Sequence, residues 1–382
     1  IKLLKSISYP KTRVINQKNS KVPTARNNGI KEARGKYICC LDADDKLAPT
    51  YLEKCLFIME LYKLDICSAW LQEFGDSNNI WHTSDLNILT IKNNNYLTVS
   101  SVFTKKMWEK TGGYNIKLNE GYEDWGFWIA IAEKGGKGMT IKEPLFFYRK
   151  HGYSLINKAM SKHTYLVEKI KTIFPRVYED EKYVHKIYKK SQTCYKAINP
   201  YINLMTHREV PLQEGILFFI PWMVTGGADK RFLAMGKALL NNGERVSFIT
   251  TEEQPQFYDN WINEYQKLTN DIFNLPALLK KEDYYTFVKY IIKSRNVKII
   301  IIGGSTYAYQ ITKKIKRDFP QIKIIDLLFN TEGHFESNLK FAEYIDTTIA
   351  ENKTISKAYK KKNLSDYKKI KVIPNGVDIS QY

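Results

Sequence analysis

The chain has 382 residues, 43% of them hydrophobic and 13% aromatic, which fits two packed domains and excludes a disordered chain. Its formal net charge of +19 favours anionic partners, but no nucleic-acid-binding motif accompanies the charge, so we expect no nucleic acid partner. No apolar run approaches the roughly 20 residues that span a bilayer.

The first part of the chain alternates predicted strands and helices. Strands are expected over residues 11–16 and 36–41, with a helix from Pro23 to Arg34 between them. The second strand runs directly into Asp42-Ala43-Asp44-Asp45. Because open α/β sheets bind ligands at the carboxyl ends of their strands, this acidic cluster is a predicted ligand site.

The rest of the chain continues the α/β pattern after a helical interruption. Further strands are predicted over residues 62–74, 97–104 and 139–148, with a helix from Glu123 to Lys134. Residues 155–212 are rich in Lys, Tyr and Ile and poor in Gly, which predicts a helical connector.

A second α/β unit is predicted over residues 213–382. Its apolar strands are expected at 216–220, 245–250, 297–302, 322–328, 344–350 and 371–373. Strands that are apolar on both faces and alternate with helices predict a doubly wound parallel sheet of the Rossmann-like kind.

The acidic cluster has the chemistry of a metal site. Asp42 and Asp44 are separated by one residue, so both carboxylates can project from an extended turn toward one point. Hard cations prefer oxygen ligands, and a bound cation can neutralise negative charge that grows on a leaving group. Asp42, Asp44 and Asp45 therefore predict a site for Mn²⁺ or Mg²⁺. The alternative for Asp44 or Asp45 is the N-cap of the following helix.

A second carboxylate pair, Glu123-Asp124, opens the predicted helix. A carboxylate next to a reacting hydroxyl can act as the base that takes its proton. Asp124 is the first candidate for this base and Glu123 is the second. The alternative is structural, because acids in the first turn of a helix oppose its dipole favourably.

These segments together resemble family 2 glycosyltransferases of the GT-A fold. The resemblance rests on residues 22–30, 33–37 and 41–45, on Gly112-Gly113-Tyr114, on Glu123-Asp124-Trp125, and on residues 148–154 as a closing motif. It covers about residues 10–154 and defines a predicted GT-A domain over 1–154. The family's opening strands, which contact the nucleotide base and ribose, would precede the first residue, so we expect a domain truncated at its N-terminus.

The resemblance implies an inverting transferase that uses a nucleotide-sugar donor, most simply a UDP-sugar, together with Mn²⁺ or Mg²⁺. By the same matching, Arg26 and Asn27 would lie near the nucleotide, and the Asp42 cluster would contact metal and diphosphate. Asp124 would lie at the acceptor hydroxyl. His151 would approach the metal or the diphosphate, although a surface position is the simpler interpretation of a lone histidine after a strand.

In the second unit, Gly226-Gly227 follows a strand and opens a helix, where backbone N–H groups can hold an anion. A purely structural turn is the alternative. With Asp229 and the segment 372–378, this half resembles the N-terminal domain of a family 4 glycosyltransferase of the GT-B fold. The resemblance implies an acceptor-side Rossmann-like domain, with His334 at its cleft or in a loop. The second GT-B domain would lie beyond residue 382.

The predicted function is transfer of a sugar to a glycan or lipid-linked acceptor hydroxyl, as in surface polysaccharide synthesis. The alternative is a non-catalytic fragment that binds glycan or an anionic membrane surface. The five cysteines lack CxxC spacing and are interpreted as free thiols in a reducing compartment. We therefore expect a cytoplasmic protein. Peripheral contact with the inner face of the membrane is one interpretation of its charge, and a solvated lysine-rich surface is the simpler one.

Overall fold

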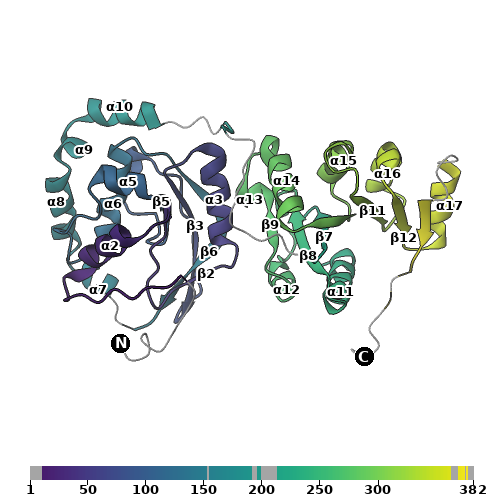
Figure 1. The fold of residues 1–382 in the computed structure, drawn as a ribbon, viewed down its shortest axis with the longest axis horizontal. Helices are drawn as coiled ribbons and strands as arrows, with labels where there is room; N and C mark the ends of the chain where they lie inside the picture. The colour runs from purple at the N-terminus through teal and green to yellow at the C-terminus, as the bar shows by residue number, and fades with distance from the viewer. Residues whose placement is uncertain are drawn as a thin grey trace. The chain divides into compact units, whose positions relative to one another are not determined.

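The computed structural model describes residues 11–152, 155–191, 196–198, 213–362, 369–374 and 376. The chain divides into two compact units, Ile1–Asn199 and Pro200–Tyr382. Both are mixtures of helices and strands, which confirms the predicted α/β class (Figure 1). No described helix has the length and apolar character needed to cross a bilayer. The predicted motif residues Tyr153, Ser154, Asn375, Val377 and Asp378 lie outside the described part of the chain.

The first unit is built on a mixed sheet with the strand order β1-β5-β3-β6-β2, and β4 pairs with β3 beside this path. Its strands are β1 (Tyr37–Ile38), β2 (Lys46–Leu47), β3 (Ile66–Gly75), β4 (Ile80–Trp81), β5 (Val102–Thr104) and β6 (Gly138–Lys150). The two long strands, β3 and β6, run parallel, and the other pairings are antiparallel. The end of β6 therefore lies beside the end of β3 and next to β2, which directly follows the aspartate cluster.

Helices cover both faces of this sheet. They are α2 (Lys21–Glu32), α3 (Tyr51–Tyr62), α4 (Ile88–Ile91), α5 (Lys105–Thr111), α6 (Glu123–Glu133), α7 (Leu155–Met160), α8 (His163–Ile173), α9 (Pro175–Glu179) and α10 (Glu181–Ser191). Figure 1 shows α3 on one side of β3 and β6, and α5 and α6 on the other. Buried aromatic residues of α6, including Trp125 and Trp128, form the centre of the main core on that side.

The helical segment after β6 does more than connect two domains. This segment contributes five side chains to the buried cluster that contains the residues of α6. They are Ile170 of α8, Phe174 between α8 and α9, Val177 of α9, and Val184 and Ile187 of α10. The described helices of the predicted connector therefore complete the core of the first unit. The predicted end of the first domain at residue 154 and the predicted end of the connector at residue 212 stay predictions.

The predicted strand over residues 11–16 is wrong. Residues 12–20 have no regular structure, and Val14 and Ile15 remain 57% and 47% exposed. A short apolar run forms a strand only where a neighbouring strand supplies hydrogen-bond partners. In the described structure the sheet ends at β1, which pairs with β5 and has only two residues.

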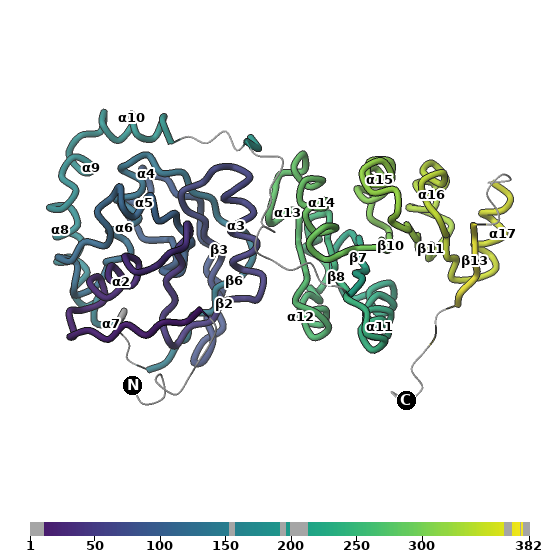
Figure 2. The backbone as a smooth tube through the Cα atoms, viewed as in Figure 1, coloured from purple at the N-terminus to yellow at the C-terminus, as the bar shows by residue number. Residues whose placement is uncertain are grey.

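The second unit contains a parallel sheet with the order β13-β12-β11-β10-β7-β8-β9, as the apolar runs predict. Its strands are β7 (Gly215–Ile220), β8 (Arg245–Thr250), β9 (Ile272–Asn274), β10 (Val297–Ile302), β11 (Lys323–Leu328), β12 (Thr347–Ala350) and β13 (Ile370–Val372). The chain moves outward from β7 to β9 and then returns to place β10 beside β7 (Figure 2). The carboxyl ends of β7 and β10 therefore form the switch point of the sheet, the usual ligand position in this class.

Helices lie on both faces of the second sheet. They are α11 (Gly227–Asn241), α12 (Ile262–Gln266), α13 (Leu275–Leu278), α14 (Tyr284–Ser294), α15 (Thr306–Asp318), α16 (His334–Phe341) and α17 (Lys353–Lys362), with 3-10 turns at Lys281–Asp283 and Ala342–Tyr344. In Figure 1, α14, α15 and α16 follow one face, and α11 and α12 follow the other. This arrangement confirms the doubly wound architecture.

The buried carboxyl group of Asp326 on β11 makes the stability of this unit depend on pH. The Tyr309 hydroxyl donates to its Oδ1 at 2.8 Å and the Asn338 amide donates to its Oδ2. Burial raises the pKa of Asp326 to about 7, against the effect of these two donors. The contribution of the protonated Asp326 carboxyl group to stability is therefore fully present at a pH below about 4, its pKa in the unfolded chain. This contribution is lost as the pH rises through its folded pKa of about 7.

Between pH 5 and pH 8, we expect the free energy of unfolding of the wild type to fall by about 2–3 kcal/mol relative to that of Asp326→Asn. The reason is that the amide of the Asp326→Asn variant stays neutral at both pH values, whereas the buried Asp326 carboxyl group ionises. Urea unfolding of both proteins at each pH measures this double difference, in which all other titrating groups cancel. An equal difference in unfolding free energy at the two pH values would contradict the raised pKa.

Candidate functional site

The aspartate cluster forms a turn between β1 and β2, closed by a hydrogen bond from the Asp45 N–H to the Asp42 carbonyl at 3.1 Å. It is not a helix cap, because Thr50 occupies the N-cap position of α3 and the strand β2 lies between. The structure thus removes the structural alternative for Asp44 and Asp45. The cluster is instead held against the end of β6.

Asp45 points inward and fixes this contact. Its Oδ1 accepts the backbone N–H of Arg149 at 2.9 Å, and its Oδ2 is buried without a hydrogen-bond partner among the described residues. Burial raises the pKa of Asp45 to about 6; the Arg149 N–H opposes this shift, and Asp44 and Asp42 add to it. A buried carboxylate oxygen with no donor is a costly feature that a cation would relieve.

Asp44 points outward toward the segment that follows β6. Its Oδ2 lies 3.2 Å from Nε2 of His151, and its carbonyl oxygen accepts the Arg149 Nε–H at 3.0 Å. Both side chains are about half exposed. A carboxylate and an imidazole that converge from separate segments are a suitable donor pair for a divalent cation.

Asp42 has a different partner. The Arg26 guanidinium on α2 lies 3.0 Å from Asp42 Oδ1 and 2.8 Å from Glu123 Oε1. Burial opposes the charge of Arg26, which is 11% exposed, but Tyr114, Asp42 and Glu123 raise the pKa of the guanidinium. One buried cation therefore joins two acidic motifs that are 81 positions apart in the sequence.

The predicted set of Asp42, Asp44, Asp45 and His151 is consequently not assembled around one point. Within the described part of the chain, no group of three or more His, Cys, Asp or Glu side chains has a metal-holding arrangement. Arg26 holds Asp42, and Asp45 is turned toward the Arg149 backbone. Asp44 and His151 remain together, so these two residues fit a cation as a pair. In the same turn, Asp45 Oδ2 is the carboxylate oxygen that is buried without a hydrogen-bond partner among the described residues.

The acid pair begins α6 as predicted, with Tyr122 as the N-cap residue in a left-handed conformation at φ 61°. Asp124 Oδ1 accepts the Trp125 N–H at 2.8 Å, and its Oδ2 accepts from the Asn95 amide at 3.1 Å. Burial raises the pKa of Asp124, while Trp125, Arg26 and Asn95 favour its ionised form. Burial and the charge of Asp124 raise the pKa of Glu123 to about 7, against the effect of Arg26.

Asn95 is a site residue that the sequence does not reveal. It lies in a run of three asparagines with no motif around it, and only the packing of α4 against α6 brings it to Asp124. Its amide donates to the carboxylate that the proposed reaction requires, so it orients this side chain.

Asn27 supports the turn at Gly112-Gly113-Tyr114, and its position near a nucleotide stays a prediction. Its Oδ1 accepts from the Tyr114 N–H at 2.9 Å and from the Trp108 indole at 3.0 Å, and its Nδ2 donates to the Tyr114 carbonyl at 2.8 Å. Gly113 has φ +79°, and a Cβ there would lie 2.6 Å from the Asn27 oxygen. The Asn27 amide therefore holds this turn, which lies against the helix of Arg26, in its conformation through its bonds to Tyr114 and Trp108.

In the second unit, Gly226 is the N-cap of α11 and Gly227 its first residue, at the switch point of the sheet. Asp229 holds this turn, since its Oδ1 accepts from the Val224 N–H at 3.3 Å and the Tyr265 hydroxyl at 2.7 Å. A Cβ at Gly227 would meet nothing within 4 Å. His334 begins α16 and covers Gly304, another glycine at the strand ends, and burial lowers the pKa of its imidazole.

Comparison with known proteins finds similarity to glycosyltransferases over the part of the chain that holds the acidic motifs. Residues 2–130 match the model of glycosyl transferase family 2. The chain is 31% identical over 158 residues to the uncharacterized glycosyltransferase MJ1057 of Methanocaldococcus jannaschii, covering 38% of this chain and 54% of that protein. It is 27% identical to the putative teichuronic acid biosynthesis glycosyltransferase TuaG of Bacillus subtilis, covering 47% of this chain and 68% of the relative.

Two further matches are more distant. Chondroitin synthase of Escherichia coli is 24% identical over 182 residues, which are 41% of this chain and 25% of that enzyme. The structure of S. aureus TarS 1–349 in complex with UDP-GlcNAc aligns with 46% of this chain and 53% of that chain, at 12% identity and a TM-score of 0.37. The chain spans about half or less of the length of MJ1057 and chondroitin synthase. The relation of the second unit to family 4 stays a prediction. The match to the glycosyl transferase family 2 model lies within the first unit.

Proposed function

We propose that the first unit is a metal-dependent inverting glycosyltransferase that moves a sugar from a nucleotide-sugar donor, most simply a UDP-sugar, to an acceptor hydroxyl. The carrying observation is the Arg26 bridge, because it brings the aspartate turn and the acid pair to one site. The acceptor is a glycan or a lipid-linked glycan, and the role is polysaccharide synthesis. Relatives named for teichuronic acid biosynthesis and for chondroitin synthesis support this role.

Asp124 acts as the base in this proposal. The acceptor oxygen forms a bond to the anomeric carbon while the bond from that carbon to the diphosphate breaks, and the acceptor proton passes to Asp124. Burial raises the pKa of Asp124, which makes its carboxylate a stronger proton acceptor. Asn95 and the Trp125 N–H hold the carboxylate in position, and Glu123 keeps Arg26 in place.

Asp44 and His151 would hold the cation, and Arg26 would add fixed positive charge beside them. A bound Mn²⁺ or Mg²⁺ supplies neutralisation of the charge that grows on the leaving diphosphate. Arg26 is already paired with Asp42 and Glu123, so its contribution is electrostatic and its orientation is set before a donor arrives.

Metal binding gives a test that does not need turnover. Asp44→Ala and His151→Ala are each expected to weaken Mn²⁺ binding in the presence of UDP by at least about 10-fold, since each removes one ligand. Isothermal titration of the whole chain with Mn²⁺ at saturating UDP measures the affinity.

Asp180→Ala serves as a matched control, because Asp180 is similarly exposed and pairs with Arg176 on α9. It should bind Mn²⁺ like wild type. Wild-type protein that binds no Mn²⁺ with UDP would favour a non-catalytic module that binds glycan or an anionic membrane surface. Unchanged affinity in both ligand variants would remove Asp44 and His151 from the proposed metal site.

A further inference from the structure

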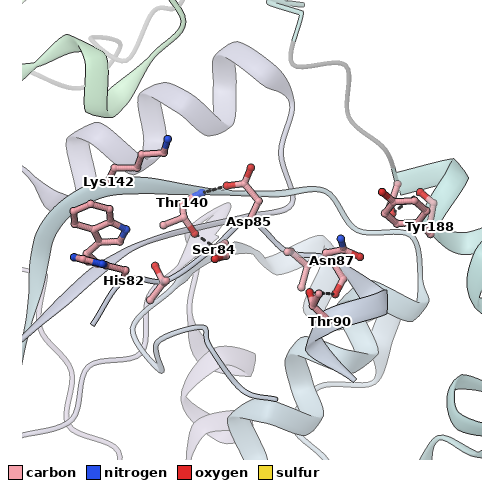
Figure 3. Close-up of a pocket in the computed structure, with 12 residues that line it drawn as sticks. His82, Ser84, Asp85, Asn87, Thr90, Thr140, Lys142 and Tyr188 are labelled. Carbon is pink, nitrogen blue, oxygen red and sulfur yellow. Dashed lines mark hydrogen bonds between the residues drawn. The ribbon is translucent and has the colours of Figure 1, made fainter. Parts of the chain in front are cut away.

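The first unit contains a cavity of about 520 Å³ that residues of several elements line (Figure 3). Its walls come from β3, the loop after β4, α4, β6 and α10. The lining residues that matter are Trp70, His82, Asp85, Asn87, Lys142 and Tyr188. None of the residues assigned above to metal or proton transfer lines it. Its volume lies within the roughly 300–1,000 Å³ typical of small-molecule sites.

The polar floor of the cavity is fixed before any ligand arrives. Asp85 Oδ1 accepts the Thr140 N–H of β6 at 2.8 Å, and the Thr140 hydroxyl donates to the Ser84 carbonyl at 2.8 Å. These bonds fasten the loop to the strand and hold the Asp85 carboxylate in place, as Figure 3 shows. A carboxylate has about four lone-pair sites, so it can accept from ligand hydroxyls in addition to the Thr140 N–H.

One end of the cavity is aromatic. The ring centroids of Trp70 and His82 lie 4.1 Å apart with planes inclined by 38°. Trp70 is partly exposed and His82 is exposed, so the pair offers an apolar face with polar ring edges. Tyr188 of α10 lies at the opposite end in Figure 3. Rigid aromatic side chains bind an apolar ligand face at low conformational cost.

Hydrogen-bond donors complete the lining. Among the described residues, the Lys142 ammonium has no ion-pair or hydrogen-bond partner, and neither does the Asn87 NH₂ group. Asn87 uses its Oδ1 to cap α4 by accepting the Leu89 N–H at 2.9 Å, which fixes the direction of that NH₂ group. The cavity therefore presents a carboxylate acceptor, two kinds of donor and an aromatic face together.

We propose that this cavity is a saccharide-binding site, separate from the transfer site, that holds a segment of a glycan chain. Pyranose hydroxyls both donate and accept, which matches Asp85 facing donors from Asn87 and Lys142, and the apolar face of the ring matches Trp70. A nucleotide diphosphate fits less well, because Asp85 would repel its phosphates and only Lys142 would oppose that repulsion. The site goes beyond the proposed transfer reaction, and its test does not depend on that reaction.

Binding of two defined glycans tests the proposal: chitotetraose as a neutral chain, and a tetrasaccharide of alternating hexuronic acid and N-acetylhexosamine as an anionic chain. We expect at least one to bind the whole chain in isothermal titration. His82→Ala and Asp85→Asn should each weaken that binding by at least about 10-fold. Asp85→Asn keeps an oxygen for the Thr140 N–H, so the loop should stay folded.

One control separates this site from general effects. His185→Ala removes an exposed histidine of α10 that does not line the cavity and should leave the affinity unchanged. The proposal is overturned if neither tetrasaccharide binds at millimolar concentration, if His82→Ala and Asp85→Asn both bind like wild type, or if His185→Ala weakens binding as much as they do.

Discussion

Asp124→Asn is expected to lower kcat for sugar transfer by about 10²–10⁴-fold, the usual contribution of a positioned general base. The substitution keeps the size of the side chain and an oxygen that can accept the Trp125 N–H. It removes the group that takes the acceptor proton. Donor and acceptor should still bind, so KM should change much less than kcat. Initial rates with a panel of UDP-sugars and Mn²⁺ measure both constants.

Glu123→Gln is the matched variant, one position away in the same helical turn. It weakens the ion pair with Arg26, so we expect a smaller loss of kcat and a larger rise in donor KM. Circular dichroism should show the same helix content in both variants. If Glu123→Gln abolished turnover while Asp124→Asn kept it within a few-fold of wild type, Glu123 would be the base.

The difference between these two carboxylates is visible only in three dimensions. The sequence places both in the first turn of a helix, which the structure confirms, and there the structural and catalytic interpretations are equally satisfied. The two carboxylates differ in their hydrogen-bond partners. Arg26 comes from α2 and Asn95 from the loop after α4, and neither contact follows from local sequence.

The sequence predicts a strand correctly where the burial of the strand follows from its own residues. The apolar runs of β7, β8 and β10 are buried on both faces, so composition alone identifies them. The two-residue strands β1, β2 and β4 exist because longer partners lie beside them, so their lengths could not be read from their own residues. The short strand β9 was missed for the same reason, since its three residues form the edge of the sheet next to β8.

The predicted metal ligands point apart in this structure for a related reason. Three aspartates in four residues look equivalent in sequence, but each faces a different neighbour: Arg26 for Asp42, His151 for Asp44 and the Arg149 backbone for Asp45. Those neighbours come from α2 and from the end of β6. Spacing indicates that the carboxylates can converge, and the surrounding chain determines whether they do.

The second large effect is expected in the second unit, at the buried ion pair of Asp271 and Arg295. Arg295 is 1% exposed, and its Nη2 and Nε donate to the two carboxylate oxygens at 2.9 and 3.1 Å. Arg245 donates to the same carboxylate from β8 at 2.8 Å. Burial opposes ionisation, but the two arginines lower the pKa of Asp271. Its stabilising effect is therefore present at neutral pH and lost as the pH falls below about 4.

Asp271→Ala should lower the free energy of unfolding of this unit by about 3–5 kcal/mol, because Arg295 would remain buried opposite a missing carboxylate. Hydrogen exchange of the β8 and β10 backbone, followed by mass spectrometry, reports on this unit alone. Adding Arg295→Met should recover part of the loss, since the double variant buries no unpaired charge. Glu264→Ala, which removes an exposed pair with Lys267 at 2.7 Å, should cost less than about 1 kcal/mol. If Asp271→Ala lowered the free energy of unfolding no more than Glu264→Ala does, the buried ion pair would contribute to packing and not to electrostatic stabilisation.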